Sequence, residues 1–167
     1  MEETKRYLNL FANLLERPHA AARVRGSKDY PHIAGDVYFY QTGDGVLVAA
    51  EITGLPKGTQ PCGEKIFAMH IHSGGKCSGD ESDPFAEALA HYDPEGCPHP
   101  HHAGDLAPLF GNRGKAFQVF LTNRFSVYEI IGKTVIVHAG PDDFSSQPAG
   151  NAGAKIACGE IRAMSLF

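Results

Sequence analysis

The sequence lacks the features that would place it in several specialised classes. Its 167 residues contain no Trp, and we find no internal repeat and no low-complexity tract. No stretch reaches the about 18 uncharged apolar residues that a membrane-spanning helix needs, so we expect no membrane span. No Lys/Arg run is dense enough to follow a phosphate backbone, and the formal net charge is −4. We therefore do not expect nucleic acid as a partner.

A secretory signal peptide is also poorly supported. The chain begins with Met1-Glu2-Glu3, which is acidic where a positive region is expected, and Asn9 and Asn13 interrupt the nearby apolar stretch. We expect a cytoplasmic protein by default, although Ala20–Ala22 weakly resemble a cleavage site and keep export open.

The start of the chain favours a helix instead. Residues 4–16 carry apolar side chains at helical spacing before Pro18, which predicts a short amphipathic helix. We expect residues 1–18 to form an N-terminal extension and residues 19–167 to form one domain.

The rest of the sequence favours an all-β fold. Nineteen Gly and 11 Pro without a fixed period indicate many turns. Short runs rich in Val, Ile, Tyr and Phe predict strands, and Thr42-Gly43-Asp44-Gly45 predicts a tight hairpin between the first two. The expected strands are residues 33–40, 45–52, 65–72, 116–122, 126–131, 133–138 and 155–164. This pattern predicts a sandwich or barrel with long loops over residues 73–114 and 139–153, and loops of that length are usually functional.

Seven of the nine histidines fall between residues 70 and 138. His70 and His72 are two residues apart in an expected strand, so both imidazoles project from one face. His138 ends another expected strand and could complete a nitrogen-rich site if the two strands are neighbours. Such a site suits copper.

A second histidine series lies in the loop over residues 73–114. Its pattern H-x7-H-x2-H-x2-D offers three imidazoles and one carboxylate, which is a plausible tetrahedral zinc set. The members are His91, His99, His102 and Asp105. Spacing alone leaves His101 as an alternative to His102, and we treat His19, His32 and His101 as non-ligands by default.

The spacing of the four cysteines does not distinguish disulfides from metal ligands. They could form two disulfides, with three possible pairings, or bind metals.

Several motifs together resemble the copper/zinc superoxide dismutase family over residues 33–167, in a divergent, bacterial-type form. The similar segments are Phe67-Ala68-Met69-His70-Ile71-His72, His91-Tyr92-Asp93-Pro94, His102-Ala103-Gly104-Asp105-Leu106, Gly132 to His138, Gly150-Asn151-Ala152-Gly153 and Ala157-Cys158-Gly159. The resemblance implies a Greek-key β-barrel or sandwich of about eight antiparallel strands.

The resemblance also implies the ligands of two metals. Copper would be bound by His70, His72, His91 and His138, and zinc by His91, His99, His102 and Asp105. His91 would bridge both metals and pass a proton to nascent peroxide. Asp142 matches the family's aspartate that hydrogen-bonds one ligand of each metal, here His70 and His99.

The family's disulfide maps to Cys77 and Cys158. Cys62 and Cys97 then remain, and a second disulfide between them is our default expectation. A pair of reduced thiols is the first alternative, and Cys97 as a metal ligand is the second.

The sequence departs from the family at Lys155, three residues before Cys158, where relatives usually carry an arginine beside copper. An ammonium keeps the positive charge but lacks the planar fork of a guanidinium, so we expect reduced turnover. Both metal-site loops are short, which makes zinc occupancy a weaker expectation than copper binding.

We therefore predict an enzyme that disproportionates superoxide with copper and zinc as cofactors. The competing hypothesis is a copper-binding or copper-delivery module with the same fold and little turnover. The resemblance is also compatible with a homodimer, whose interface the N-terminal helix could cover.

Overall fold

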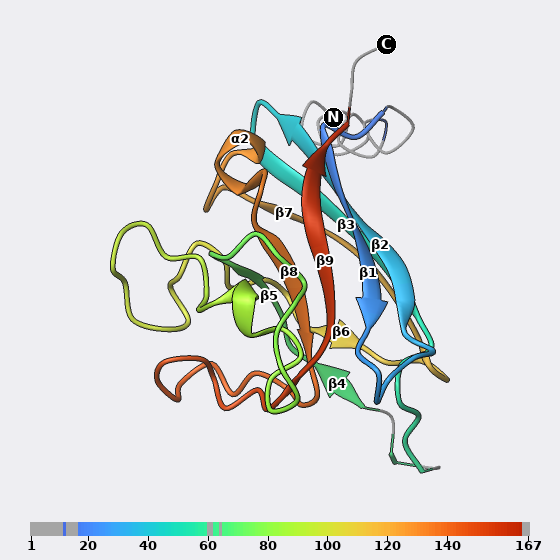
Figure 1. The fold of residues 1–167 in the computed structure, drawn as a ribbon. Coiled ribbons are helices and arrows are strands. Elements are labelled where there is room, and N and C mark those ends of the chain that lie inside the picture. Colours follow the sequence, from blue (N-terminus) through green and yellow to red (C-terminus); the bar gives the residue numbers. More distant parts are fainter. Residues whose placement is uncertain (1–11, 13–16, 60–61, 64, 165–167) are drawn as a thin grey trace.

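The computed structural model describes residues 12, 17–59, 62–63 and 65–164, and these residues form an antiparallel β-structure (Figure 1). The strands are β1 (Ala20–Gly26), β2 (Ala34–Thr42), β3 (Gly45–Thr53), β4 (Ile66–Phe67), β5 (Met69–His72), β6 (Leu109–Phe110), β7 (Lys115–Thr122), β8 (Thr134–His138) and β9 (Lys155–Ala163). Besides these strands the described part contains two short helical elements, η2 (Ala86–Ala88) and α2 (Val127–Ile130). No helix within it is long and apolar enough to cross a membrane.

Seven strands form one curved sheet in the order β5-β8-β9-β1-β2-β3-β7, and β4 pairs with β6. Every strand pair is antiparallel. The first and last strands of the sheet in sequence, β1 and β9, are hydrogen-bonded neighbours, and β3 pairs with β7 across a long stretch of intervening chain. The predicted all-β fold is confirmed.

Alternation of side chains places the core on one face of this sheet. The predicted hairpin joins β2 and β3 through a two-residue turn, because Thr42 pairs with Gly45. On the inner face of this hairpin Val37, Phe39 and Val48 are fully buried. They belong to one large apolar cluster to which all the long strands contribute.

Several predictions of secondary structure were wrong. β6 lies within the expected loop over residues 73–114, and the expected strand over residues 65–72 is divided into β4 and β5. Residues 126–131 were expected to be a strand, but they contain α2. Ser126 and Glu129 form a capping box at its start, and this local pairing outweighs the β-propensity of Val127 and Ile130. No strand was expected at β1, because its Ala-rich sequence has little β-propensity; β1 forms because its buried residues Ala20, Ala22 and Val24 face the core.

The expected helix over residues 4–16 lies outside the described residues apart from Ala12.

Two long loops position the site. Residues 73–108 contain η2 but no strand, and residues 139–154 connect β8 to β9. Both leave the part of the sheet formed by β5, β8 and β9, and Figure 1 shows them on the same side of the molecule. The Cys77–Cys158 disulfide attaches the first loop to β9. The long loops predicted from sequence therefore converge beside the strands that carry His70, His72 and His138.

Candidate metal centre

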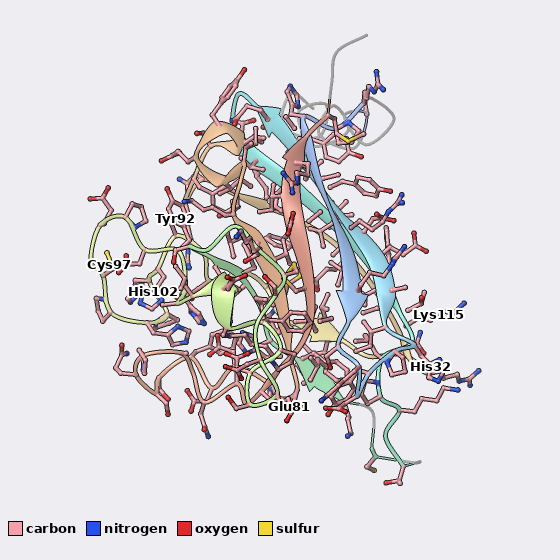
Figure 2. The ribbon with its side chains drawn as sticks, in the orientation of Figure 1. His32, Glu81, Tyr92, Cys97, His102 and Lys115 are labelled. Atoms are coloured by element: carbon pink, nitrogen blue, oxygen red, sulfur yellow. A yellow bond between two sulfur atoms is a disulfide. The ribbon has the colours of Figure 1, made fainter. Side chains whose placement is uncertain are left out.

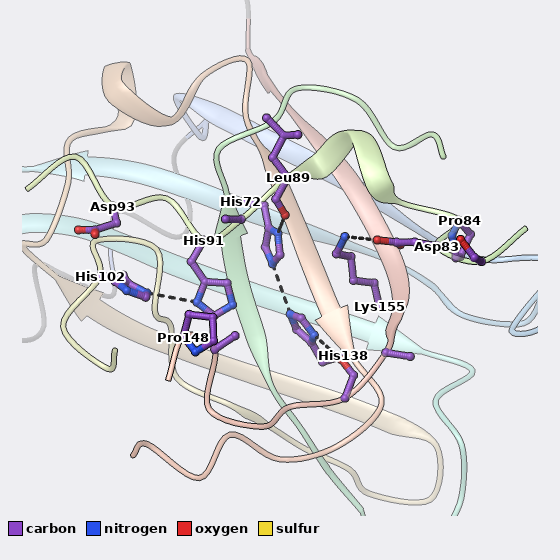
Figure 3. Close-up of a pocket in the computed structure, with 15 residues that line it drawn as sticks. His72, Asp83, Pro84, Leu89, His91, Asp93, His102, His138, Pro148 and Lys155 are labelled. Carbon is purple, nitrogen blue, oxygen red and sulfur yellow. Dashed lines mark hydrogen bonds and ion pairs between the residues drawn. The ribbon is translucent and has the colours of Figure 1, made fainter. Parts of the chain in front are cut away.

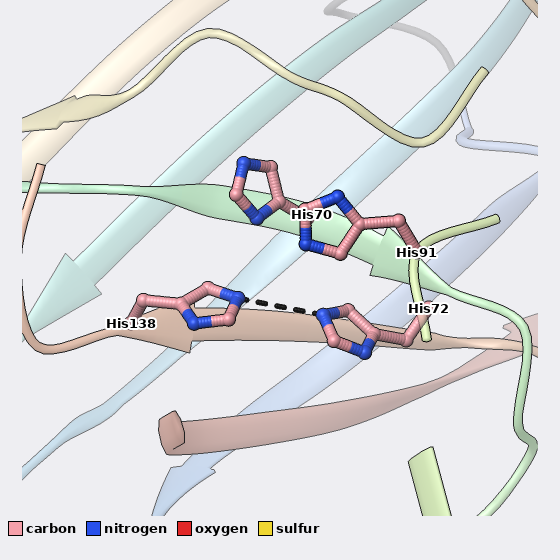
Figure 4. A group of neighbouring side chains, drawn as sticks. All are labelled: His70, His72, His91 and His138. Atoms are coloured by element: carbon pink, nitrogen blue, oxygen red, sulfur yellow. Dashed lines mark hydrogen bonds between the residues drawn. The ribbon is translucent and has the colours of Figure 1, made fainter. Parts of the chain in front are cut away.

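Two groups of buried side chains could each hold a metal ion. In each group four ligand atoms lie within 4.8 Å of one another. The first group is His70, His72, His91 and His138, and the second is His91, His99, His102 and Asp105. His91 belongs to both groups, so the two sites share one ring. Figure 4 shows the first group, with the His91 ring beside His70 and the rings of His72 and His138 facing each other.

Strand pairing brings the first group together. β5 pairs with β8, which places His138, at the end of β8, next to the strand that carries His70 and His72. Because Ile71 points to the opposite face, His70 and His72 project together. An isolated β-bridge between His72 and His91 then fixes the loop over this face of the sheet.

Backbone carbonyls orient two of these rings. Nδ1 of His72 donates to the carbonyl oxygen of Leu89 at 2.7 Å, and Nδ1 of His138 donates to that of Gly153 at 3.1 Å. The two Nε2 atoms are consequently directed toward each other and lie 3.4 Å apart. Both rings thus present Nε2 to the space between them.

Asp142 links the two groups through hydrogen bonds to one histidine of each. Its Oδ2 accepts from Nε2 of His70 and its Oδ1 accepts from Nε2 of His99, both at 2.8 Å. The backbone N–H of Phe144 also donates to Oδ1 at 2.7 Å. The outward nitrogens of His70 and His99 are therefore engaged, and their Nδ1 atoms are left to face the centre.

The second group is organised around Asp105. Its Oδ1 lies 2.8 Å from Nδ1 of His91 and 3.4 Å from Nδ1 of His102. Its Oδ2 accepts from the backbone N–H of His102 at 3.0 Å. Nδ1 of His99 lies 3.0 Å from the same oxygen, but without the alignment of a hydrogen bond, so this ring nitrogen has no hydrogen-bond partner.

Burial keeps the rings of His70, His72 and His138 neutral. Desolvation, reinforced by neighbouring histidines, lowers the pKa of His70 to about 3, that of His72 to about 2 and that of His138 to about 4. For Asp105, burial acts in the opposite direction, but the hydrogen bond with His91 and the adjacent histidines lower its pKa to about 2. Neutral imidazoles and an ionised carboxylate are the protonation states that bind metal ions.

The residues present fit copper and zinc. Nδ1 of His70, Nε2 of His91 and Nδ1 of His99 are buried without any hydrogen-bond partner among the described residues, a costly state that a bound cation would relieve. Four imidazoles suit copper, and three imidazoles with one carboxylate suit tetrahedral zinc. Nε2 of His91 belongs to the first group while its Nδ1 faces Asp105, so one ring can serve both.

Sequence reasoning missed two side chains that hold the second group. Nη1 of Arg124 lies 3.0–3.2 Å from the carbonyl oxygens of Pro100, His102 and Asp105. Gln147 accepts from the backbone N–H of His99 at 3.0 Å and donates to the carbonyl oxygen of the same residue at 2.6 Å. Both act on the backbone, which leaves no recognisable spacing in the sequence.

A cavity of about 590 Å³ opens beside the first group. Among its lining residues are His72, His91, His138 and Lys155 (Figure 3). Lys155 is thus placed where an anion approaching the site would meet it. Its Nζ, however, donates to Oδ2 of Asp83 at 2.6 Å, a contact that the sequence did not predict.

The cysteines follow one expectation and contradict another. The Cys77–Cys158 disulfide is present, whereas Cys62 and Cys97 are both free. The default expectation of a second disulfide was therefore wrong. Cys62 is exposed, and Cys97, labelled in Figure 2, is half-buried in the loop over residues 73–108.

Comparison with known proteins agrees with this geometry. The profile of the family described as copper/zinc superoxide dismutase matches residues 33–161. The chain is 33% identical over 145 residues to superoxide dismutase [Cu-Zn] 2 of Aquifex aeolicus, covering 78% of this chain and 80% of that protein. It is 32% identical over 151 residues to superoxide dismutase [Cu-Zn] of Deinococcus radiodurans, covering 79% of each. The solved structure of the Cu/Zn superoxide dismutase from Brucella abortus is similar with a TM-score of 0.71 at 25% identity, covering 84% of this chain and 98% of that one.

Proposed function

The chain belongs to the copper/zinc superoxide dismutase family, and from this premise we propose that it converts two superoxide anions and two protons into dioxygen and hydrogen peroxide. The observation that carries the proposal is the ring of His91, which is shared between a four-imidazole group and a group of three imidazoles and a carboxylate. Bound copper supplies the one-electron couple that oxidises one superoxide to dioxygen and reduces the next to peroxide.

The residues of the two groups would bind different metals, and Asp142 orients one ring in each group. His70, His72, His91 and His138 would hold copper, and His91, His99, His102 and Asp105 would hold zinc. Asp142 fixes the orientation of one ring in each set through its two 2.8 Å contacts. Because these contacts engage the outward ring nitrogens, the rings need little rearrangement when the ions bind.

His91 is the residue best placed to move a proton. Its Nδ1 is held by Asp105 at 2.8 Å, while its Nε2 is buried and has no hydrogen-bond partner. A proton taken up at Nε2 would face the cavity side of the first group and could pass to peroxide as it forms. Coordination of zinc by His91 and the rest of the second group would keep the ring in place during the transfer.

The competing function, a copper-delivery module with little turnover, is not favoured. A carrier needs ligands that release copper, but this chain also retains the second group, the shared His91 and the bridging Asp142. These features rigidify the first group and serve no purpose in storage alone.

The decisive experiment measures catalysis on the loaded protein. Copper and zinc stoichiometry are verified by elemental analysis, and superoxide decay is then followed by pulse radiolysis. We expect decay that is first order in enzyme and far faster than spontaneous disproportionation. A rate equal to the spontaneous one at full copper occupancy would support the delivery module instead.

We further propose that the protein forms a homodimer. Support comes from Phe110 and Phe117, whose large apolar side chains are exposed and line one shallow groove next to the edge strand β7. Light scattering should give twice the mass of the 18.0 kDa chain, and Phe117→Glu should reduce it to one chain. A single-chain mass for the unaltered protein would refute this proposal.

A further inference from the structure

The cavity beside the first group has an unusual charge balance. Its lining contains one Lys or Arg side chain, Lys155, and two carboxylates, Asp83 and Asp93. The side chains around an anion substrate's approach therefore carry a net negative charge before any metal is counted. Among the described residues that line the cavity, only Lys155 carries an ammonium or guanidinium charge that attracts an anion.

That ammonium is already occupied. Nζ of Lys155 lies 2.6 Å from Oδ2 of Asp83 and 3.1 Å from the carbonyl oxygen of Phe85. The Lys155 side chain is 16% exposed and that of Asp83 38%, so water reaches the pair mainly from the Asp83 side. In Figure 3 a dashed line joins the Lys155 ammonium to Asp83, beside the rings of His72 and His138.

The pair is held from both ends. Lys155 is the β-ladder partner of His138 at a register shift between β8 and β9, which fixes the root of its side chain beside the first group. Oδ1 of Asp83 accepts from the backbone N–H of Phe85 at 3.0 Å. The Cys77–Cys158 disulfide ties the loop that carries Asp83 to the strand that carries Lys155. The backbone segments that carry the two charges are therefore fixed relative to each other.

An ion pair at contact distance attracts a third charge far less than a lone cation does. The field of the ammonium is largely cancelled by the carboxylate at distances longer than the pair itself. Lys155 still acts on its neighbour, since its charge is among the causes that lower the pKa of His138, after burial and the nearby His91. An incoming anion must therefore compete with Asp83 for the ammonium.

We propose that Asp83 is a specificity-determining residue of this cavity, which limits the affinity of the site for small anions by holding the Lys155 ammonium in an ion pair. Where the anion is superoxide, the inference rests on the proposed function. It predicts that removal of this acidic residue from the cavity wall improves anion capture by more than the loss of one nearby negative charge alone would do.

The test compares Asp83→Asn with the unaltered protein, both loaded with copper and zinc. Asparagine can still accept from the N–H of Phe85 but cannot neutralise Lys155. We expect azide, used as a small anionic probe and titrated by the copper absorption band, to bind at least roughly threefold more tightly. Superoxide decay should accelerate by a similar factor and fall more steeply with added salt.

Glu81→Gln is the matched control. Glu81 is an exposed residue in the same loop, two positions before Asp83, and it does not line the cavity. The Glu81→Gln substitution removes one negative charge but leaves the contacts of Lys155 unchanged. Azide affinity that changes equally in both variants, or that does not rise in Asp83→Asn, would overturn the proposal.

A second pair of variants isolates the role of Lys155. In a Lys155→Gln background, Asp83→Asn should change azide affinity no more than Glu81→Gln does, because the partner is gone. If Asp83→Asn fails to load copper, Asp83→Ser gives the same comparison with a smaller turn-forming side chain. If the unaltered protein does not dismutate superoxide but Asp83→Asn binds azide more tightly, only the proposed function is defeated. If the unaltered protein dismutates superoxide but Asp83→Asn does not bind azide more tightly, only this inference is defeated.

Discussion

Gly150 shows how one backbone position can set the geometry of a polar cluster. Its φ is +65°, and a Cβ built there would overlap Oδ1 of Asp142 and lie 2.7 Å from Nε2 of His99. Only glycine therefore allows the loop to close over the carboxylate that joins the two groups. The Gly-Asn segment noted in the sequence has a steric cause in the folded chain.

We expect Gly150→Ala to disrupt the contacts of Asp142 and to weaken zinc retention about tenfold or more. Competition with a chromophoric chelator measures the zinc affinity. Gly96→Ala is the control, because Gly96 has nearly the same φ, +68°, but no atom lies within 4 Å of the place that an added Cβ would occupy. Equal zinc affinities in the two variants would show that backbone strain, not the contact with Asp142, is responsible.

His91 is the residue on which the shared-ligand interpretation depends. Since its two nitrogens serve different groups, His91→Ala should weaken copper and zinc binding together. His72→Ala should weaken copper far more than zinc, because His72 belongs to the first group alone. Isothermal titration of the metal-free variants with each ion distinguishes the cases. Unchanged zinc affinity in His91→Ala would contradict a shared ring.

At the level of elements, the loop over residues 91–105 is held by a side chain from the far end of β7. Arg124 follows that strand and reaches three carbonyl oxygens of the loop. Each neutral hydrogen bond contributes only about 1 kcal/mol, but the three together restrain the segment that carries His99 and His102. The loop thus depends on the sheet for its conformation as well as on its own sequence.

Arg124→Ala should lower zinc affinity by about tenfold while leaving copper affinity nearly unchanged. The reason is that the carbonyl groups it contacts flank ligands of the second group only. Arg23→Ala removes the same charge from an exposed position on β1 and should leave both affinities unchanged. Parallel loss of copper and zinc in Arg124→Ala would indicate a general loss of folding instead.

The disulfide is the other link between elements. Cys77 and Cys158 are 81 residues apart in sequence, so in the chain-entropy model their bond stabilises the fold by on the order of 4 kcal/mol. Replacement of both cysteines by serine should lower the free energy of unfolding by roughly that amount in guanidinium titrations. Replacement of the free Cys62 by serine should not. A double variant as stable as the unaltered protein would mean that the disulfide does not reduce the conformational entropy of the unfolded chain.

For the whole molecule, the two groups join strands β5 and β8 to both long loops, so bound metals should stabilise the entire domain. Each ion at a free concentration a thousand times its dissociation constant adds about 4 kcal/mol, which corresponds to about 10 °C in melting temperature. Calorimetry before and after chelation, with elemental analysis, measures this difference. A melting temperature that stays the same after complete metal removal would contradict the assignment of these groups as metal sites.

The sequence by itself determined the all-β class and the β2–β3 hairpin, through side-chain alternation and a tight-turn pattern. Histidine spacing gave candidate members of both groups, whereas the place of His91 in the first group was implied by the family resemblance. The spacing left His101 and His102 as alternatives, and the structure places His102 in the second group. The Cys77–Cys158 pairing was implied by resemblance alone.

Only the tertiary structure decided the contacts between segments remote in sequence. It left Cys62 and Cys97 unpaired, placed Arg124 on the loop carbonyls and paired Lys155 with Asp83. The physical reason is that these outcomes depend on which groups meet across the folded chain, through single hydrogen bonds and ion pairs to side chains or backbone oxygens. Such contacts impose no periodicity on the sequence, so no local pattern could have predicted them.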